Sequence, residues 1–235
     1  MTTQPIDFGR TEALTFDCYG TLIDWDTGIT GAIRPILDTR GLRVDDADVL
    51  DRYARHEAAA EAGPYLRYRD ILATCLRGIC TELGVEPTAA EVEGFAAAVG
   101  DWPPFADSVA ALRALEGRFR LGVITNCDDD LFARSNARLG VAFDWVVTAQ
   151  QVGSYKPDER NFQAAFERIG LPLGRIVHVA QSLYHDHVPA RRLGLASAWI
   201  NRRGEDPAAV PEAAPSATYP DMATFAAAAT TPPAG

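Results

Sequence analysis

The second half of the chain alternates short apolar runs with helical segments, and this alternation constrains the fold more than any other feature of the sequence. Such repetition predicts a parallel sheet whose strands are joined by right-handed helical crossovers, and therefore an α/β fold. The runs with strand character are 121–125, 145–147, 176–180 and 196–200, and helical patterns cover 107–116, 129–139, 159–169 and 186–193.

An earlier helical region interrupts this pattern. A first strand, 13–16, ends at Asp17, and turn residues follow. From about residue 26 to 98, apolar residues recur at helical spacing without a convincing strand, until Trp102-Pro103-Pro104 breaks the pattern. We therefore predict an inserted helical domain. Its expected bounds are 25–103, within a core made of 10–24 and 104–225.

The sequence shows no sign of export or of a membrane-spanning segment. Residues 1–13 have no basic segment followed by an apolar one, and no run approaches 18 uncharged apolar residues. The four cysteines lack C-x-x-C spacing. We therefore expect a cytoplasmic protein with reduced thiols and no contact with a membrane. Residues 226–235 are Ala, Thr, Pro and Gly, and we expect a disordered tail there.

The basic residues are few and almost all of one type. Lys and Arg number 22 against 32 Asp and Glu, a net charge of -10, which argues against nucleic acid as a partner and favours a small substrate held locally. Of the 22 basic residues, only Lys156 is a lysine. A lysine retained against such a bias is a candidate for a site where the broad, planar guanidinium of arginine does not fit.

Polar side chains follow the predicted strands at the edge where an α/β sheet places its chemistry. They supply carboxylates, hydroxyls, amides and the single lysine, which together are candidates for an active site. Each also has a structural alternative, such as helix capping for Asp186, turn formation for Thr125-Asn126 and packing for His185. The candidates are Asp17, Thr125, Asn126, Lys156, Gln181, Ser182 and Asp186.

Four segments in this order resemble the motifs of the haloacid dehalogenase superfamily. They are Phe16-Asp17-Cys18-Tyr19-Gly20-Thr21-Leu22, Ile124-Thr125-Asn126, Tyr155-Lys156-Pro157-Asp158 and Ser182-Leu183-Tyr184-His185-Asp186. The resemblance implies a Rossmann-like core with a helical cap inserted after the first motif. It also implies that Asp17 is the nucleophile, that Thr125 with Asn126 holds the substrate anion, that Lys156 pairs with Asp17, and that Asp186 lies beside them.

Two departures distinguish this chain from the phosphatases of that superfamily. Tyr19 stands where phosphatases usually carry an acid that protonates the leaving alkoxide, whereas a halide leaves without a proton. Gln181 replaces an acid in the fourth motif, which removes one anionic ligand for Mg²⁺. Both changes favour the L-2-haloacid dehalogenase branch, whose F-D-x-Y-G-T-L pattern the first motif matches.

The resemblance to that branch is incomplete. Leu183 stands where its members usually have the Asn that positions the hydrolytic water, and Phe162 where they tend to have Tyr. We therefore hypothesise that His185 acts as the base on that water. A cationic residue of the cap is expected to bind halide, with Arg55 the nearest candidate and Arg52 and Arg69 as rivals.

These observations predict a capped hydrolase that converts a short L-2-haloacid to a 2-hydroxyacid through an ester on Asp17. Its expected partner is a small anionic organic acid, and no cofactor is expected. The remaining predicted substrate-binding residues are Tyr19 and Thr21. The alternatives are a phosphatase in which Asp17 and Asp186 hold Mg²⁺, and a catalytically weakened binding protein. Relatives of this kind are often dimers, so a homodimer stays open.

Overall fold

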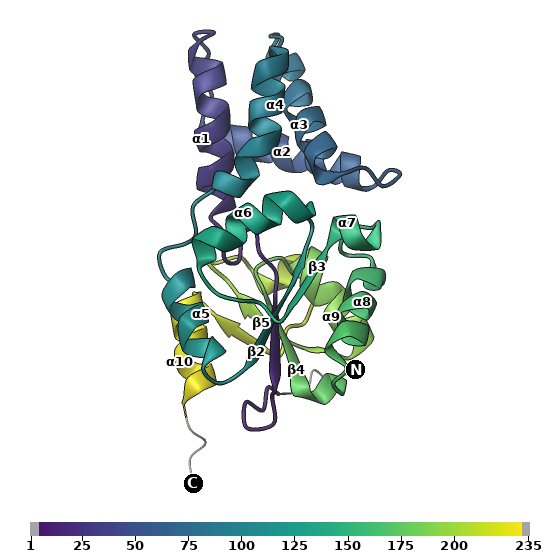
Figure 1. Ribbon diagram of the computed structural model, residues 1–235. Helices are drawn as coiled ribbons and strands as arrows, with labels where there is room; N and C mark the ends of the chain where they lie inside the picture. The colour runs from purple at the N-terminus through teal and green to yellow at the C-terminus, as the bar shows by residue number, and fades with distance from the viewer. Residues whose placement is uncertain (1–4, 232–235) are drawn as a thin grey trace.

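A six-stranded parallel sheet forms the centre of the molecule (Figure 1). The computed structural model describes residues 5–231. The strands lie in the order β3-β2-β1-β4-β5-β6, and all neighbours pair in parallel. Their bounds are β1 Ala13–Phe16, β2 Arg120–Thr125, β3 Trp145–Thr148, β4 Ile176–Ala180, β5 Ala196–Ile200 and β6 Ala217–Tyr219. The predicted α/β fold is confirmed.

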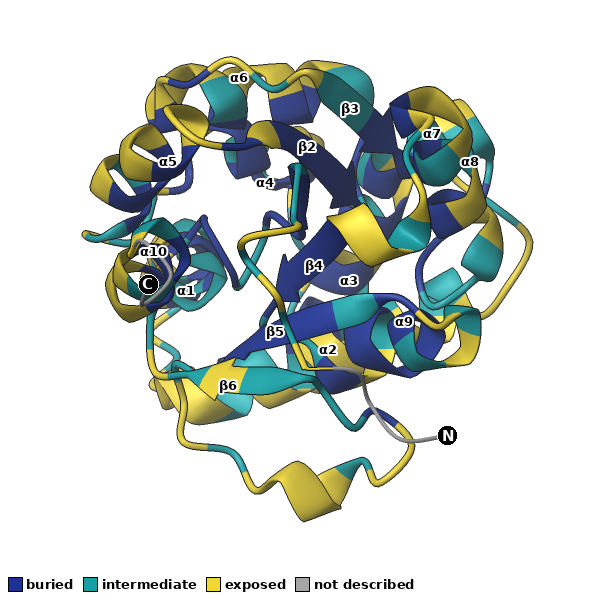
Figure 2. Cartoon of the chain, turned by 90° about the horizontal axis from the view of Figure 1, so that it is seen from below, coloured by how far each residue is buried: buried dark blue, intermediate teal, exposed yellow. Residues whose placement is uncertain are grey.

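Helices cover both faces of this sheet. Figure 2 shows α5 and α10 on one face and α8 and α9 on the other. Alternate residues of the central strand divide between the two layers: Leu14 and Phe16 belong to one apolar cluster, and Ala13 to the other. The helices of this core are α5 Ser108–Glu116, α6 Asp129–Leu139, α7 Ala149–Val152, α8 Glu159–Ile169, α9 Val188–Leu193 and α10 Met222–Thr230, with short 3-10 turns at Leu173–Arg175 and Pro207–Ala209.

The inserted region forms a separate helical cap above the sheet (Figure 1). Its two connections to the core lie side by side, because Ile23 and Pro104 form an antiparallel bridge. The Asp24 amide donates to the Pro103 carbonyl oxygen at 2.8 Å. The cap helices are α1 Trp25–Asp38, α2 Asp46–Glu61, α3 Tyr68–Glu82 and α4 Ala89–Ala98, followed by a 3-10 turn at Val99–Asp101.

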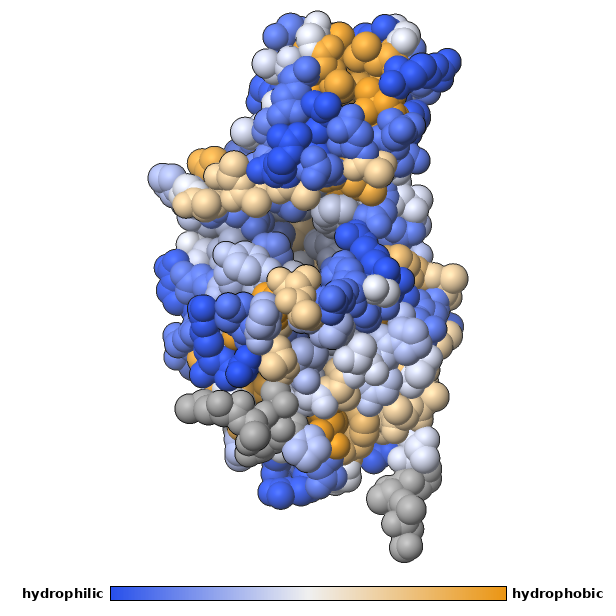
Figure 3. Space-filling view, turned by 180° about the vertical axis from the view of Figure 1, so that it is seen from behind, coloured by the Kyte–Doolittle hydropathy of each residue, from blue (hydrophilic) through white to orange (hydrophobic). Residues whose placement is uncertain are grey.

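The face of the molecule seen in Figure 3 is mainly hydrophilic over the core and the cap, with an apolar patch near the free end of the cap. Within residues 5–231, no helix combines the length and the apolar character needed to cross a membrane.

The prediction of a disordered tail from Ala226 is wrong for the residues that the structure describes. Helix α10 continues to Thr230, and the side chains of Ala226 and Ala229 are buried against the core. Alanine has the highest helix propensity, so this composition continues a helix once one face of it can pack. Residues 232–235, the rest of the predicted tail, lie outside the described residues.

Helix α10 should therefore contribute measurably to stability. Phe225 is fully buried and packs edge-on against the rings of Phe8 and Tyr219. We expect Phe225→Ala to lower the free energy of unfolding by about 3–5 kcal/mol, as measured by urea denaturation. The control Ala227→Ser changes an exposed position of the same helix and should cost less than about 1 kcal/mol. Equal stability of both variants would contradict this packing.

Candidate active site

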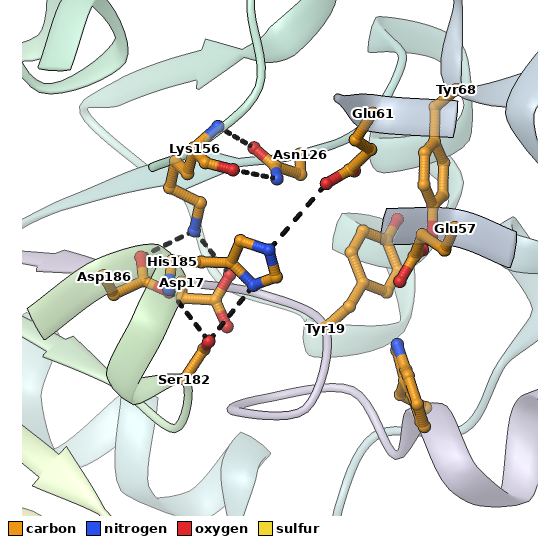
Figure 4. A pocket seen from close by; sticks show the side chains of 11 residues that line it. Asp17, Tyr19, Glu57, Glu61, Tyr68, Asn126, Lys156, Ser182, His185 and Asp186 are labelled. Atoms are coloured by element: carbon orange, nitrogen blue, oxygen red, sulfur yellow. Dashed lines mark hydrogen bonds and ion pairs between the residues drawn. The ribbon is translucent and has the colours of Figure 1, made fainter. Parts of the chain in front are cut away.

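Two buried carboxylates share one buried lysine at the carboxyl edge of the sheet (Figure 4). The Lys156 ammonium lies 2.8 Å from Oδ1 of Asp17 and 2.7 Å from Oδ1 of Asp186. Asp17 directly follows β1, Lys156 lies between α7 and α8, and Asp186 follows β4. The parallel strands therefore bring these three groups together from distant parts of the chain. The predicted pairing of Lys156 with Asp17 is present, and Asp186 joins it.

The charges of this cluster stabilise one another. Burial alone would disfavour the ammonium, but the two carboxylates outweigh it and raise the pKa of Lys156 above its ordinary value. Burial also opposes ionisation of Asp186, yet the Lys156 charge and a hydrogen bond from His178 lower the pKa of that carboxyl. His178 Nε2 donates to Asp186 Oδ1 at 2.9 Å, and its Nδ1 lies 2.9 Å from the Thr15 hydroxyl. Lys156 and Asp186 therefore keep their charges at neutral pH.

Backbone and hydroxyl groups fix the Asp17 side chain. The Thr21 hydroxyl donates to Asp17 Oδ2 at 2.7 Å and accepts the Gln181 amide N–H at 2.8 Å. The Asp17 amide donates to the Val179 carbonyl oxygen at 3.0 Å. Thr21 thus orients the Asp17 carboxylate, whereas its predicted role is to bind substrate. The two Asp17 oxygens have different partners, Lys156 on one and Thr21 on the other.

Asn126 positions the lysine. Its amide nitrogen donates to the Lys156 carbonyl oxygen at 3.1 Å, and its amide oxygen accepts the Lys156 backbone N–H at 2.7 Å. This pair of bonds fixes the loop from which the ammonium extends. Asn126 also lines the cavity, so its predicted contact with substrate stays open.

His185 and Ser182 form one wall of the cavity above Asp17. They lie at a single π-helical turn, Leu183–His187, which precedes α9. The predicted helix over 186–193 is therefore divided between this turn and α9. Ser182 Oγ accepts the His185 backbone N–H at 3.1 Å and lies 3.1 Å from His185 Nδ1. Burial lowers the pKa of His185 below its ordinary value. The imidazole is therefore neutral at pH 7 and held in a defined orientation.

The cap closes the cavity with acidic and aromatic side chains. Glu57 and Glu61 lie one turn apart on α2 and line the same space of about 60 Å³ as Asp17 and Lys156. Tyr68 (Figure 4) lines the cap side of this space, and Trp25 also belongs to its lining. This space adjoins an outer cavity of about 430 Å³ that shares six of its lining residues, Tyr19, Trp25, Glu57, Glu61, Ser182 and His185. Sequence reasoning missed these two glutamates, although their i, i+4 spacing places them on one helix face.

The prediction of Arg55 as a halide-binding cation is wrong. The Arg55 side chain is 53% exposed and pairs with Asp51 and Glu82 on the outer side of the cap. Its rival Arg52 pairs with the same Glu82, and Arg69 pairs with Asp130. The cavity residues of α2 come from the other face of that helix. A helical stretch rich in arginine does not reveal from sequence which face meets the core.

The other predicted residues have mixed outcomes. Tyr19 lines the cavity, but its hydroxyl lies 3.0 Å from Ser135 Oγ and accepts the Cys127 thiol at 3.3 Å. Gln181 lines the outer cavity, and its side-chain amide donates to Glu205. The Thr125 hydroxyl is buried, has no hydrogen-bond partner among the described residues and is absent from the lining of the inner cavity. Its predicted role in holding the substrate therefore finds no support in this geometry.

The carboxylates of this cluster leave few free oxygens for the Mg²⁺ of the phosphatase alternative. Lys156 occupies Oδ1 of both Asp17 and Asp186, and Thr21 occupies Oδ2 of Asp17. Over residues 5–231, no three His, Cys, Asp or Glu side chains gather as metal ligands. A hard cation needs several free oxygens, whereas in this cluster only Oδ2 of Asp186 is buried without a hydrogen-bond partner among the described residues.

Comparisons with known proteins agree with this architecture. The family model for haloacid dehalogenase-like hydrolases matches residues 11–186. An (S)-2-haloacid dehalogenase of Pseudomonas putida is 27% identical over 202 residues, covering 82% of this chain and 85% of its own. A 5-amino-6-(5-phospho-D-ribitylamino)uracil phosphatase of Escherichia coli is 29% identical over 214 residues, covering 84% and 87%.

Solved structures show the same fold. A defluorinating L-2-haloacid dehalogenase superposes with a TM-score of 0.80 at 24% identity, covering 94% of this chain and 96% of its own. The L-2-haloacid dehalogenase of Xanthobacter autotrophicus with covalently bound chloropropionic acid superposes with a TM-score of 0.78 at 17% identity, covering 92% and 97%.

Removing the shared cation should destabilise the protein. We expect Lys156→Met to lower the free energy of unfolding by about 3–5 kcal/mol, because it leaves two buried carboxylates uncompensated. Lys156→Arg keeps the charge and should cost less, although its planar group is broader than the ammonium that it replaces. The added change Asp186→Asn should recover part of the Lys156→Met loss. Urea denaturation at pH 7 measures all three, and an unchanged stability of Lys156→Met would refute this account.

Proposed function

Because the chain belongs to the haloacid dehalogenase-like hydrolases, we propose that it hydrolyses a short 2-haloacid to the 2-hydroxyacid through an ester on Asp17. The observation that supports this most is the Asp17 carboxylate, which lysine and threonine hold at the base of a small cavity. The similarity to an (S)-2-haloacid dehalogenase, which covers 82% of this chain, agrees with it. The E. coli phosphatase covers the chain equally well, so the choice between the two chemistries depends on the site.

In the first step, an Asp17 oxygen attacks C2 of the substrate and the halide leaves with the bonding electrons. This displacement forms the ester and needs no proton on the leaving group. The site fits that requirement, because the Tyr19 hydroxyl beside Asp17 is occupied by Ser135 and Cys127. Burial is the main cause that raises the pKa of Tyr19 well above its ordinary value. Lys156 and Thr21 keep the carboxylate oriented during the attack.

In the second step, water attacks Cγ of the Asp17 ester and His185 accepts its proton. Ser182 Oγ has two acceptor positions, so it can take both the His185 backbone N–H and Nδ1–H, which leaves the lone pair of Nε2 free. The neutral imidazole is the form that a base requires. The ester then breaks at Cγ, and the proton returns to the departing alkoxide. The new hydroxyl oxygen comes from Asp17, and the water oxygen stays on Asp17.

The decisive assay follows halide release from 2-chloropropionate in EDTA, beside p-nitrophenyl phosphate with and without Mg²⁺. We expect EDTA-resistant halide release that is abolished in Asp17→Asn, because the amide cannot act as the nucleophile. A single turnover in ¹⁸O-water should leave the label on Asp17, as detected by peptide mass spectrometry. Phosphate release that requires Mg²⁺, without halide release, would overturn the proposal.

His185→Ala should trap the ester. We expect intact-mass analysis to show a covalent adduct on this variant, with turnover at least 100-fold slower, because the hydrolytic step loses its base. Wild-type kcat should fall in acid, because protonation of His185 removes the base. Since the pKa of His185 is lowered, this fall should occur below the ordinary histidine value of about 6.5. The control His56→Ala removes an imidazole that contacts Glu82 outside the cavity. Normal turnover of His185→Ala without an adduct would exclude this role.

A further inference from the structure

The cap presents carboxyl groups, and no cation, to the reacting centre. Glu57 and Glu61 face the cavity opposite Asp17 and Asp186, and the only Lys or Arg among its lining residues is Lys156, which already pairs with both aspartates. Figure 4 shows the two glutamates extending from α2 toward this space. A simple haloalkanoate, which carries only negative charge, has no partner on this side of the cavity.

Two tyrosines hold Glu57 as a hydrogen-bond acceptor. The hydroxyls of Tyr53 and Tyr68 lie 2.9 Å and 2.7 Å from the same oxygen, Oε1. The hydroxyls also lie 3.0 Å from each other, and both tyrosines are buried. Both donors therefore act on one carboxyl oxygen, which orients the group and favours its ionised form. Such an arrangement is typical of a site that accepts a donor from a ligand.

Glu61 lies between Glu57 and the histidine wall. Its side chain is only 9% exposed, and its Oε2 lies 3.8 Å from His185 Nε2. Burial and the charge of Glu57 raise the pKa of Glu61 to about 9, and burial raises the pKa of Glu57. The charge of Lys156 and a hydrogen bond from Asn126 offset these effects on Glu61 only in part, so the two carboxyls do not both ionise easily. A cation between them would remove that penalty.

We propose that Glu57 and Glu61 form a subsite for a protonated amine, so that the preferred substrate is a zwitterionic 2-haloacid with an ammonium group next to C2. This inference rests on the proposed function, because Asp17 attacks the same C2. The Trp25 ring lines the same cavity and packs edge-on against Tyr53, and the Arg203 guanidinium already lies 5.3 Å from the centre of the Trp25 ring. The net charge of zero on such a substrate suits a cavity that contains more acidic than basic groups.

The first test measures binding of two possible products by calorimetry. The 3-amino-2-hydroxypropanoate ion carries the ammonium, and 2-hydroxybutanoate has a methyl group in its place. We expect wild-type protein to bind 3-amino-2-hydroxypropanoate at least 10-fold more tightly than 2-hydroxybutanoate. The variants Glu57→Gln and Glu61→Gln should each weaken that preference by about 10-fold, whereas Glu82→Gln, which changes a cap glutamate outside the cavity, should leave it intact. Equal binding of the two ligands by wild type would overturn the subsite, with no variant needed.

The second test separates this inference from the proposed function. Halide release is compared for 3-amino-2-chloropropanoate and 2-chlorobutanoate, with enzyme-free blanks that correct for cyclisation of the amine. The subsite is supported by a kcat/KM that is at least 10-fold higher for the amino substrate. In Glu57→Gln this preference should be lost because KM for the amino substrate rises. Equal or higher kcat/KM for 2-chlorobutanoate overturns the subsite and leaves the dehalogenase intact. Selective binding in calorimetry without halide release from either compound supports the subsite and refutes the dehalogenase.

Discussion

The pairing of Lys156 with two buried carboxylates is the interaction on which the rest of the site depends. Three charged groups leave water together, and only their mutual contacts at 2.7–2.8 Å offset the cost of desolvation. Each of the three charged residues is also held in place by a hydrogen bond from a neighbouring side chain. Asn126 fixes the lysine backbone, Thr21 orients Asp17, and His178 donates to Oδ1 of Asp186. The Asp17 carboxylate is therefore held in one orientation by the protein alone.

Much of the core could be predicted from the sequence because its signals are local. Each predicted strand is a short apolar run. Asp17 follows its strand directly, and Lys156 and Asp186 lie between a strand and the next core helix, so all three could be placed at one edge without coordinates. Strand β6 was missed because Ala217–Tyr219 is short and only partly buried. Helix α10 was missed because its alanines resemble a low-complexity tail, whereas Phe225 and Met222 secure it to the core.

The cap side of the site could not be predicted in the same way. Helix α2 carries charged residues on more than one face, and both Arg55 and Glu57 fit a helical pattern. Which of them faces Asp17 depends on the rotation of α2 against α3, set by the packing of Tyr53 and its neighbours. No local signal reports that rotation. The expected arginine therefore lies outside, and two glutamates lie inside.

Hydrogen bonds between the core and the cap fix the position of the cap helices above the sheet. Asp128, which follows β2, accepts the backbone N–H groups of Tyr68 and Arg69 at 3.1 Å each, so a core carboxylate caps the first turn of α3. The hydroxyl of the same Tyr68 holds Glu57. A continuous set of hydrogen bonds thus runs from the strand edge through α3 to the acid opposite Asp17. Because the cap is fixed at this point as well as at the Ile23–Pro104 bridge, the fold sets the distance between Asp17 and the cap acids. In the proposed reaction, Asp17 supplies the chemistry and the group that reaches Glu57 distinguishes one substrate from another.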